Sequence, residues 1–192
     1  LHDLTARGLG TPLLVITDGH PGLCRAVKQV FPGVRRQRCQ VHKLRNILAK
    51  LPKLAVPHLK PLLQQVFLAP DHATGLRRGR ALIARFRARY TAAMECLEKD
   101  LEECLTYLLF PKEHQKRLRT TNLLERTFEE SRRRTKVVPR FPTERACLTL
   151  VYATLITAAQ KWRGIPMNAR ILRALDKLRA GTPVTGREQA VA

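Results

Sequence analysis

Short apolar runs, and the residues that interrupt them, divide the first fifty residues into alternating strands and helices. Residues 12–17 read Pro-Leu-Leu-Val-Ile-Thr, a continuous apolar run typical of a strand buried on both faces. The next segment carries hydrophobic residues on one side of a helix until Pro32-Gly33 interrupts it. The elements predicted here are a strand at 12–17, a helix at 23–31, a strand at 34–41 and a helix from residue 42. This order is typical of a parallel sheet.

Beyond the first fifty residues the pattern is helical. Between residues 57 and 109, hydrophobic positions recur at three- and four-residue spacing, and no segment predicts a strand. Residues 77–89 include six arginines and residues 95–103 include five acids, so we expect their helices to pair by charge. Further helices are predicted at 123–136, 144–162 and 168–180, and the segment from Gly181 is expected to fray.

These elements predict an α/β fold that is mostly helical by residue count, with a parallel sheet core and a large all-helical insertion. At 192 residues, the chain has the length of one domain with such an insertion. The predicted organisation is the N-terminal part of the core at 1–50, the helical insertion at 51–115, C-terminal helices that complete the core at 116–180 and a flexible tail at 181–192.

The charge of the chain indicates its partner. Its 36 Lys and Arg residues exceed its 15 Asp and Glu residues, and the net charge of +21 attracts a polyanion such as DNA. A hydrophobic content of 44% suffices for a core, which excludes a disordered basic tail. Aromatic residues make up only 5%, which argues against a platform that stacks single-stranded bases. Ribosomal proteins, nucleoid proteins, nucleases and transposases share such a charge.

Cysteine usage and apolar run length exclude secreted and membrane-spanning proteins. The five cysteines lack the spacing of a disulfide framework and favour a reducing, cytoplasmic compartment. Uncharged apolar stretches stay shorter than 18 residues, so we expect no membrane span. The chain starts at Leu1 without a signal-peptide pattern, which predicts a fragment or a processed start.

Asp18 is the first candidate catalytic residue. It follows the predicted strand at 12–17, and in open α/β sheets reactive groups gather at the carboxyl ends of strands. Gly19 lets backbone or ligand approach closely. The alternative is that Asp18 is a turn residue, or the N-cap of the helix that opens near Pro21. His20 would orient a phosphate or be an ordinary loop histidine.

Glu125 is the second candidate. It lies three residues after Asn122, which predicts a capping box, and the helix dipole favours an acid in a first turn. One stripe of the predicted helix carries Glu125, Glu129, Arg132 and Lys136. Two acids four residues apart repel each other unless a cation lies between them. Within so basic a chain, Asp18 and Glu125 therefore predict a Mg²⁺ (or Mn²⁺) site that acts on phosphates.

A cationic run follows in the same helix. Residues 132–136 read Arg-Arg-Arg-Thr-Lys. Such a run is usually a solvated helix face, but on a chain of this charge we expect it to contact backbone phosphates without base specificity. Because it extends the helix of Glu125, it would hold a scissile strand against the metal. The predicted DNA-binding residues are Arg126, Arg132, Arg133, Arg134 and Lys136.

Cys39 and His42 form a Cys-x-x-His pair that resembles half of a zinc site. A structural zinc requires four ligands, and His114, Cys96 and Cys104 are further candidates only by default. The alternative is a buried thiol hydrogen-bonded to a histidine at a strand-to-helix junction. A cysteine nucleophile has no other support in the sequence.

Six blocks occur in the order seen in Mutator-type insertion-sequence transposases, which the chain resembles from about residue 1 to residue 180. The blocks are residues 16–23 (ITDGHPGL), 30–32 (VFP), 37–46 (QRCQVHKLRN), 110–114 (FPKEH), 119–126 (RTTNLLER) and 132–136 (RRRTK), and Trp162 also matches. The resemblance implies a partial ribonuclease-H-like core and a DDE active site. Asp18 matches the second aspartate of that site, and Glu125 matches the glutamate of the Asn-x-x-Glu-Arg box.

The resemblance also implies the function. DNA transposition would proceed by metal-dependent cutting and joining of element ends and target DNA, in the bacterial cytoplasm at the nucleoid, by a homo-oligomer when complete. The first aspartate of the family lies upstream of residues resembling 4–9, and Asp3 does not replace it, so we expect a fragment or a remnant of a decayed element. With two carboxylates instead of three, the chain by itself is expected to bind DNA without cutting it.

Two alternatives remain open at the level of sequence. The chain would be a non-catalytic basic DNA-binding protein, in which Glu125 is only a cap. Otherwise it would be a helical interaction module, in which residues 57–109 form the partner surface and nucleic acid has no role.

Overall fold

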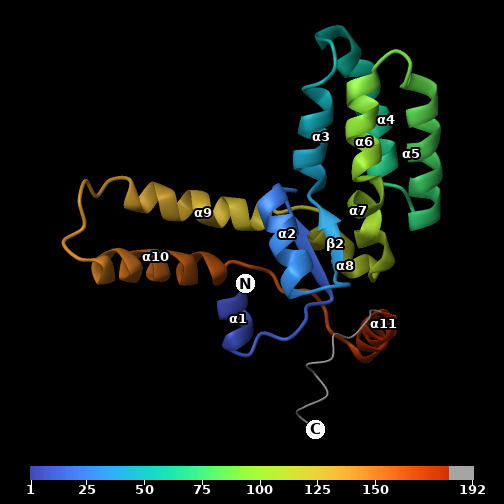
Figure 1. Ribbon diagram of the computed structural model, residues 1–192. Helices are drawn as coiled ribbons and strands as arrows, with labels where there is room; N and C mark the ends of the chain where they lie inside the picture. The colour runs from blue at the N-terminus through green and yellow to red at the C-terminus, as the bar shows by residue number, and fades with distance from the viewer. Residues whose placement is uncertain (182–192) are drawn as a thin grey trace. The chain divides into compact units, whose positions relative to one another are not determined.

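A computed structural model describes residues 1–181, which are mostly helical with one small sheet (Figure 1). The elements in chain order are α1 (His2–Ala6), β1 (Leu14–Thr17), α2 (Pro21–Val30), β2 (Arg35–Arg38), α3 (Gln40–Leu48), the 3₁₀ helix η1 (Lys53–Ala55), α4 (Val56–Phe67), α5 (His72–Phe86), α6 (Thr91–Lys99), α7 (Leu101–Leu105), the 3₁₀ helix η2 (Thr106–Leu109), α8 (Lys112–Leu118), α9 (Asn122–Thr135), α10 (Glu144–Ala159) and α11 (Ala169–Ala180). The chain divides into unit 1, formed by Leu1–Thr120 and the residues from Pro166 onward, and unit 2, formed by Thr121–Ile165.

The sheet of unit 1 consists of two parallel strands, as predicted. β1 and β2 pair with Leu14 opposite Arg35 and Thr17 opposite Arg38. A small core forms where α2 packs against β1, and it contains Val27, Phe31 and Val34 with Val15 and Val30. The order strand–helix–strand–helix is therefore confirmed, and it brings the carboxyl ends of both strands to one edge.

The predicted strands are longer than the observed ones. β1 starts at Leu14, and β2 ends at Arg38 because Gln40 already begins α3. The expectation that the first strand is buried on both faces is wrong, since only Thr17 of β1 is buried. Within the described residues β1 has a single neighbouring strand, so its apolar side chains are only partly buried.

The main hydrophobic core lies in the helical part of unit 1. Its large buried side chains include Ile47, Leu59, Leu63, Met94, Leu97 and Leu105. The prediction of helices without strands at 57–109 is confirmed. Ion pairs of Arg80 with Glu102 and of Arg87 with Glu98 join the arginine-rich segment to the acidic one, which confirms the predicted pairing by charge. These helices therefore share one hydrophobic core, and α3, which follows β2, contributes Ile47 to it.

The C-terminal helices are distributed between both units. α8 and α11 belong to unit 1, where Arg35 of β2 donates a hydrogen bond to the carbonyl of Leu178 at 2.8 Å. α9 and α10 lie side by side and form unit 2 (Figure 1). α10 ends at Ala159, so the prediction that this helix reaches Trp162 is three residues too long.

The ends of the chain add two observations. A short helix at His2–Ala6 was not predicted, and the predicted tail lies outside the described residues except for Gly181. The predicted domain boundaries at 50, 115 and 180 stay predictions. Among the helices of the described part, none is long and apolar enough to cross a membrane.

Candidate active site and nucleic-acid interface

The carboxyl edge of the sheet carries the first candidate residue. Thr17 pairs with Arg38, and the Cys39 amide donates to the Thr17 carbonyl at 2.8 Å. Asp18 is exposed just beyond this pair, and its Oδ1 accepts a hydrogen bond from the His20 amide at 3.0 Å. The N-cap of α2 is His20, so the alternative that Asp18 is an N-cap is wrong. Asp18 is a turn residue with an exposed carboxylate at the strand end.

The turn after Asp18 is built around Gly19 and Arg38. Gly19 has a φ of 82°, which only glycine adopts readily. A Cβ atom at this position would lie 2.3 Å from Cζ of Arg38, whose side chain is buried and has little room to withdraw. The backbone path that presents Asp18 therefore requires glycine at position 19.

Gly19→Ala is expected to lower the free energy of unfolding by about 2–5 kcal/mol. The left-handed conformation costs a non-glycine residue about 1–2 kcal/mol, and overpacking adds about 1–3 kcal/mol. Urea denaturation measures the loss. Gly8→Ala is the matched control, because Gly8 has a φ of 94° but no atom within 4 Å of an added Cβ. Equal losses in both variants would contradict the role of Arg38.

A buried charge cluster supports this edge from the interior. Lys43 is 2% exposed and Arg38 is 5% exposed. Oδ2 of Asp100 accepts hydrogen bonds from Nζ of Lys43 at 2.6 Å and from Nε of Arg38 at 3.3 Å. Burial opposes ionisation of Asp100, but the two cations outweigh it, so the pKa of Asp100 lies below its ordinary value. Two cations against one carboxylate give this cluster a net positive charge.

Two buried amides attach the same edge to the helical body. Oε1 of Gln37 accepts from the Tyr107 amide at 2.7 Å, and its Nε2 donates to the Cys104 carbonyl at 3.0 Å. Nε2 of Gln40 donates to the carbonyls of Cys104 at 2.8 Å and Phe67 at 3.0 Å. The position of the Asp18 turn thus depends on helices far along the chain.

These supporting residues were missed in the sequence. One signal for Lys43 exists, because Gln40, Lys43 and Ile47 fall on one face of α3 and a lysine on an otherwise buried face requires a partner. Nothing in the sequence identifies Asp100 as that partner among the five acids of residues 95–103.

The Cys-x-x-His pair lies beside this edge. Sγ of Cys39 is 3.3 Å from Nδ1 of His42, and Cys39 is fully buried. This is the geometry expected of a buried thiol hydrogen-bonded to a histidine. Nε2 of His114 lies 2.8 Å from the Pro166 carbonyl. The zinc half-site stays a prediction.

The second candidate residue, Glu125, lies in the first turn of α9 in unit 2. The N-cap is Thr121, whose side chain makes no capping hydrogen bond, and Glu125 is the fourth residue after it, so the predicted capping box of Asn122 and Glu125 is wrong. The hydroxyl of Thr121 donates a hydrogen bond to the Glu125 carboxylate. Because Asp18 belongs to unit 1 and Glu125 to unit 2, their sharing of a metal ion stays a prediction.

The predicted DNA-binding cations follow Glu125 along α9. All of them are exposed: Arg126, Arg132, Arg133, Arg134 and Lys136. Glu130 accepts hydrogen bonds from Arg133 and Arg134, each at 2.9 Å, and these neighbours lower the pKa of Glu130 to about 2. The helix is thus a basic surface with one acid held between two arginines.

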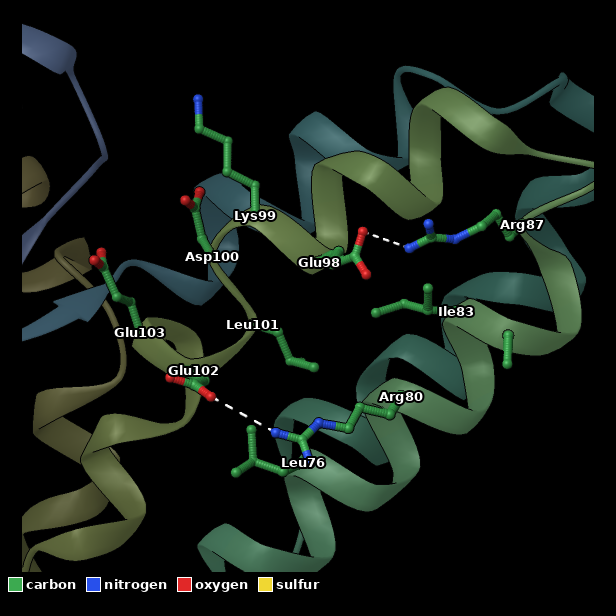
Figure 2. A pocket seen from close by; sticks show the side chains of 11 residues that line it. Leu76, Arg80, Ile83, Arg87, Glu98, Lys99, Asp100, Leu101, Glu102 and Glu103 are labelled. Carbon is green, nitrogen blue, oxygen red and sulfur yellow. Dashed lines mark ion pairs between the residues drawn. The ribbon is translucent and has the colours of Figure 1, made fainter.

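A hollow of about 600 Å³ in unit 1 has a different character (Figure 2). It lies between α5 and residues 98–103, and ion pairs of Arg80 with Glu102 and Arg87 with Glu98 cross it. Its charged lining consists of Glu98, Asp100, Glu102 and Glu103 with Arg80, Arg87 and Lys99. Each of the four acids pairs with a cation, so the hollow offers no concentration of unpaired positive charge comparable to the surface of α9.

Comparisons with known proteins cover most of the chain. A model of the family described as "Transposase, Mutator family" matches residues 1–164. The transposase for insertion sequence element IS6120 of Mycolicibacterium smegmatis is 39% identical over 181 residues, which cover 94% of this chain and 55% of the relative. The transposase for IST2 of Acidithiobacillus ferrooxidans is 37% identical over 90% of this chain and 59% of the relative. The chain spans about half the length of such relatives.

Proposed function

The chain belongs to the Mutator family of transposases, and we propose that it acts in DNA transposition as the part of an insertion-sequence transposase that carries two catalytic carboxylates, Asp18 and Glu125. The sheet and the helices around it would form part of a ribonuclease-H-like core with a helical insertion. Element ends and target DNA would be the substrates. The observation that carries the proposal is the exposed carboxylate of Asp18, held by a constrained turn at the carboxyl edge of the sheet.

The donor set fits a hard divalent cation. Asp18 and Glu125 offer carboxylate oxygens, which Mg²⁺ and Mn²⁺ prefer, and the surrounding charge attracts the phosphates that such an ion also binds. When bound, two such ions would activate the attacking oxygen and stabilise the leaving oxygen of a phosphoryl transfer. The chain itself would hold the cations and position the DNA.

Other residues would act by positioning and by charge. The Gly19 turn and the cluster of Arg38, Lys43 and Asp100 would fix the direction of the Asp18 carboxylate. Arg132 and Lys136, on the stripe of α9 that starts at Glu125, would neutralise the backbone of the strand next to the metal. Preorganised charge of this kind costs no rearrangement during the reaction.

A non-catalytic DNA-binding protein is the second candidate, and the hydrogen bond from Thr121 to Glu125 favours it. In that case Glu125 only completes the start of α9, and Gln in its place would keep the hydrogen bond. Glu125→Gln therefore separates the two functions, because the amide preserves a cap but removes a charged metal ligand.

Duplex DNA binding with a slope of log K against log salt of about −5 or steeper is expected, since this corresponds to six or more phosphate contacts. Anisotropy of a labelled duplex measures it. Replacing Arg132 and Lys136 by Gln should make the slope shallower by about 2. Replacing Arg85 and Arg89, which lie over the rings of Phe86 and Tyr90, is the matched control. A wild-type slope near zero would exclude a nucleic-acid function.

A further inference from the structure

Unit 2 contains a groove of about 730 Å³ between α9 and the C-terminal part of α10. Its wall on α9 includes part of the predicted DNA-binding run, and its other wall reaches past the end of α10. The side chains with chemistry in this lining are Arg126, Glu130, Arg133, Arg134, Lys161 and Trp162. The remaining lining consists of Leu, Ala and Thr residues, and the Thr hydroxyls donate to backbone carbonyls within their own helices.

The side chains that line the groove carry a net positive charge, which favours binding of a polyanion. Four cations and one acid line the groove, and that acid, Glu130, is already hydrogen-bonded to Arg133 and Arg134. Arg132 and Lys136 do not contribute to the lining, so the groove is a second basic surface of α9, distinct from the stripe that starts at Glu125. Lys161 extends this surface to the segment that follows α10.

The lining of the groove also includes an aromatic ring, that of Trp162. Trp162 is 41% exposed, follows Lys161 directly and is the single Trp of the chain. Indole rings stack on unpaired bases with little sequence preference, and such stacking accompanies basic grooves that follow a nucleic-acid backbone. One ring does not make a platform, but it is sufficient for one base.

We propose that this groove binds one nucleic-acid strand, with its phosphates along Arg126, Arg133, Arg134 and Lys161 and an unpaired base stacked on Trp162. This rests on the proposed function and adds the substrate class, which is a DNA end or junction with unpaired nucleotides. Glu130 acts as an internal competitor, because its carboxylate occupies the two guanidinium groups that the phosphates require.

The single Trp permits a direct test in the full chain. Titration with a tailed duplex or a single strand should quench Trp162 fluorescence, whereas a blunt duplex at equal phosphate concentration should leave it nearly unchanged. Trp162→Ala should weaken binding of the tailed duplex by about 5- to 100-fold, and Trp162→Phe should retain most of the affinity. Tyr152→Ala is the control, since Tyr152 is an exposed ring of α10 outside the lining.

A second variant tests binding in the groove without changing Trp162. Glu130→Gln should tighten binding of the tailed duplex by about 3-fold or more, because it releases two arginines. Glu144→Gln removes the same charge from α10 outside the lining and should have a smaller effect. A structural role of Glu130 on α9 would instead give unchanged or weaker binding.

The outcomes separate this inference from the proposed function. Equal affinities of wild type and Trp162→Ala for the tailed duplex, with salt-dependent binding of blunt duplex retained, would overturn the groove proposal and leave the proposed function standing. Quenching of Trp162 by polyglutamate as strong as that by DNA would also overturn it. If the wild type showed no salt-dependent DNA binding, the groove proposal and the proposed function would both be overturned.

Discussion

Asp18→Asn is expected to lower DNA cutting and joining by about 10³-fold or more, and Glu125→Gln by a similar factor. A bound metal contributes several kcal/mol of transition-state stabilisation, and each 1.36 kcal/mol corresponds to a factor of ten in rate. The amides keep the shape of both side chains but remove the charge that holds the cation. DNA affinity should change far less, because phosphate contacts by Lys and Arg provide most of it.

Strand cutting and joining by a transposase of the relatives' full length that includes this sequence, measured with Mg²⁺ or Mn²⁺, checks this loss. Asp3→Asn is the matched control, since Asp3 is an exposed acid paired with Arg7 at 3.4 Å and is not proposed as a ligand. An Asp18→Asn enzyme that kept a tenth of the wild-type rate would show that this carboxylate is not a metal ligand. Unchanged rates in Glu125→Gln would support the cap alternative.

Asp100→Asn is expected to lower the free energy of unfolding by about 3–5 kcal/mol, because removal of one partner leaves a buried charge uncompensated. Lys43 is the affected cation, since it is 2% exposed and its Nζ lies 2.6 Å from the Asp100 carboxylate. Lys43→Met leaves Asp100 paired with Arg38, so it should cost less. Urea denaturation of both variants provides the comparison, and equal losses would contradict the assigned pairing.

The effect of Asp100→Asn on the free energy of unfolding is expected to depend on pH. The pKa of Asp100 is lowered in the folded chain from an ordinary value of 3.8, so the ionised carboxylate binds its partners more strongly than the protonated one. Its contribution is complete above that ordinary value and is lost as the pH falls through the lowered pKa. The stability difference between wild type and Asp100→Asn should therefore shrink in acid. A difference that stayed constant down to low pH would exclude an ionised Asp100 as the cause.

Local patterns predicted the part of the fold that positions Asp18. The apolar run before Asp18 and the Pro32-Gly33 break lie within a few residues of the elements they define, so β1 and α2 could be placed. The end of β2 was misplaced because Val41 continues an apparent alternation although it belongs to α3. The N-cap of α9 was misplaced by one residue, since Thr121 and Asn122 both suit that position.

Contacts between distant residues could not be predicted in this way. Lys43 and Asp100 are 57 residues apart, and Gln37 and Tyr107 are 70 residues apart. Helical periodicity shows which face is buried, but it carries no information on which buried polar groups meet. The groove of unit 2 was missed for the same reason, because Lys161 and Arg126 come together only when α9 and α10 pack.

We propose that Asp18 and Glu125 share a divalent ion, and a double-mutant cycle of Mn²⁺ affinity in this chain tests this sharing most directly. Calorimetric titration of wild type, Asp18→Asn, Glu125→Gln and the double variant gives the four affinities. Ligands of one ion act as a unit, so each single substitution should remove most of the affinity and the double variant should lose little more. Additive losses, or Mn²⁺ affinity unchanged in either single variant, would contradict the shared site.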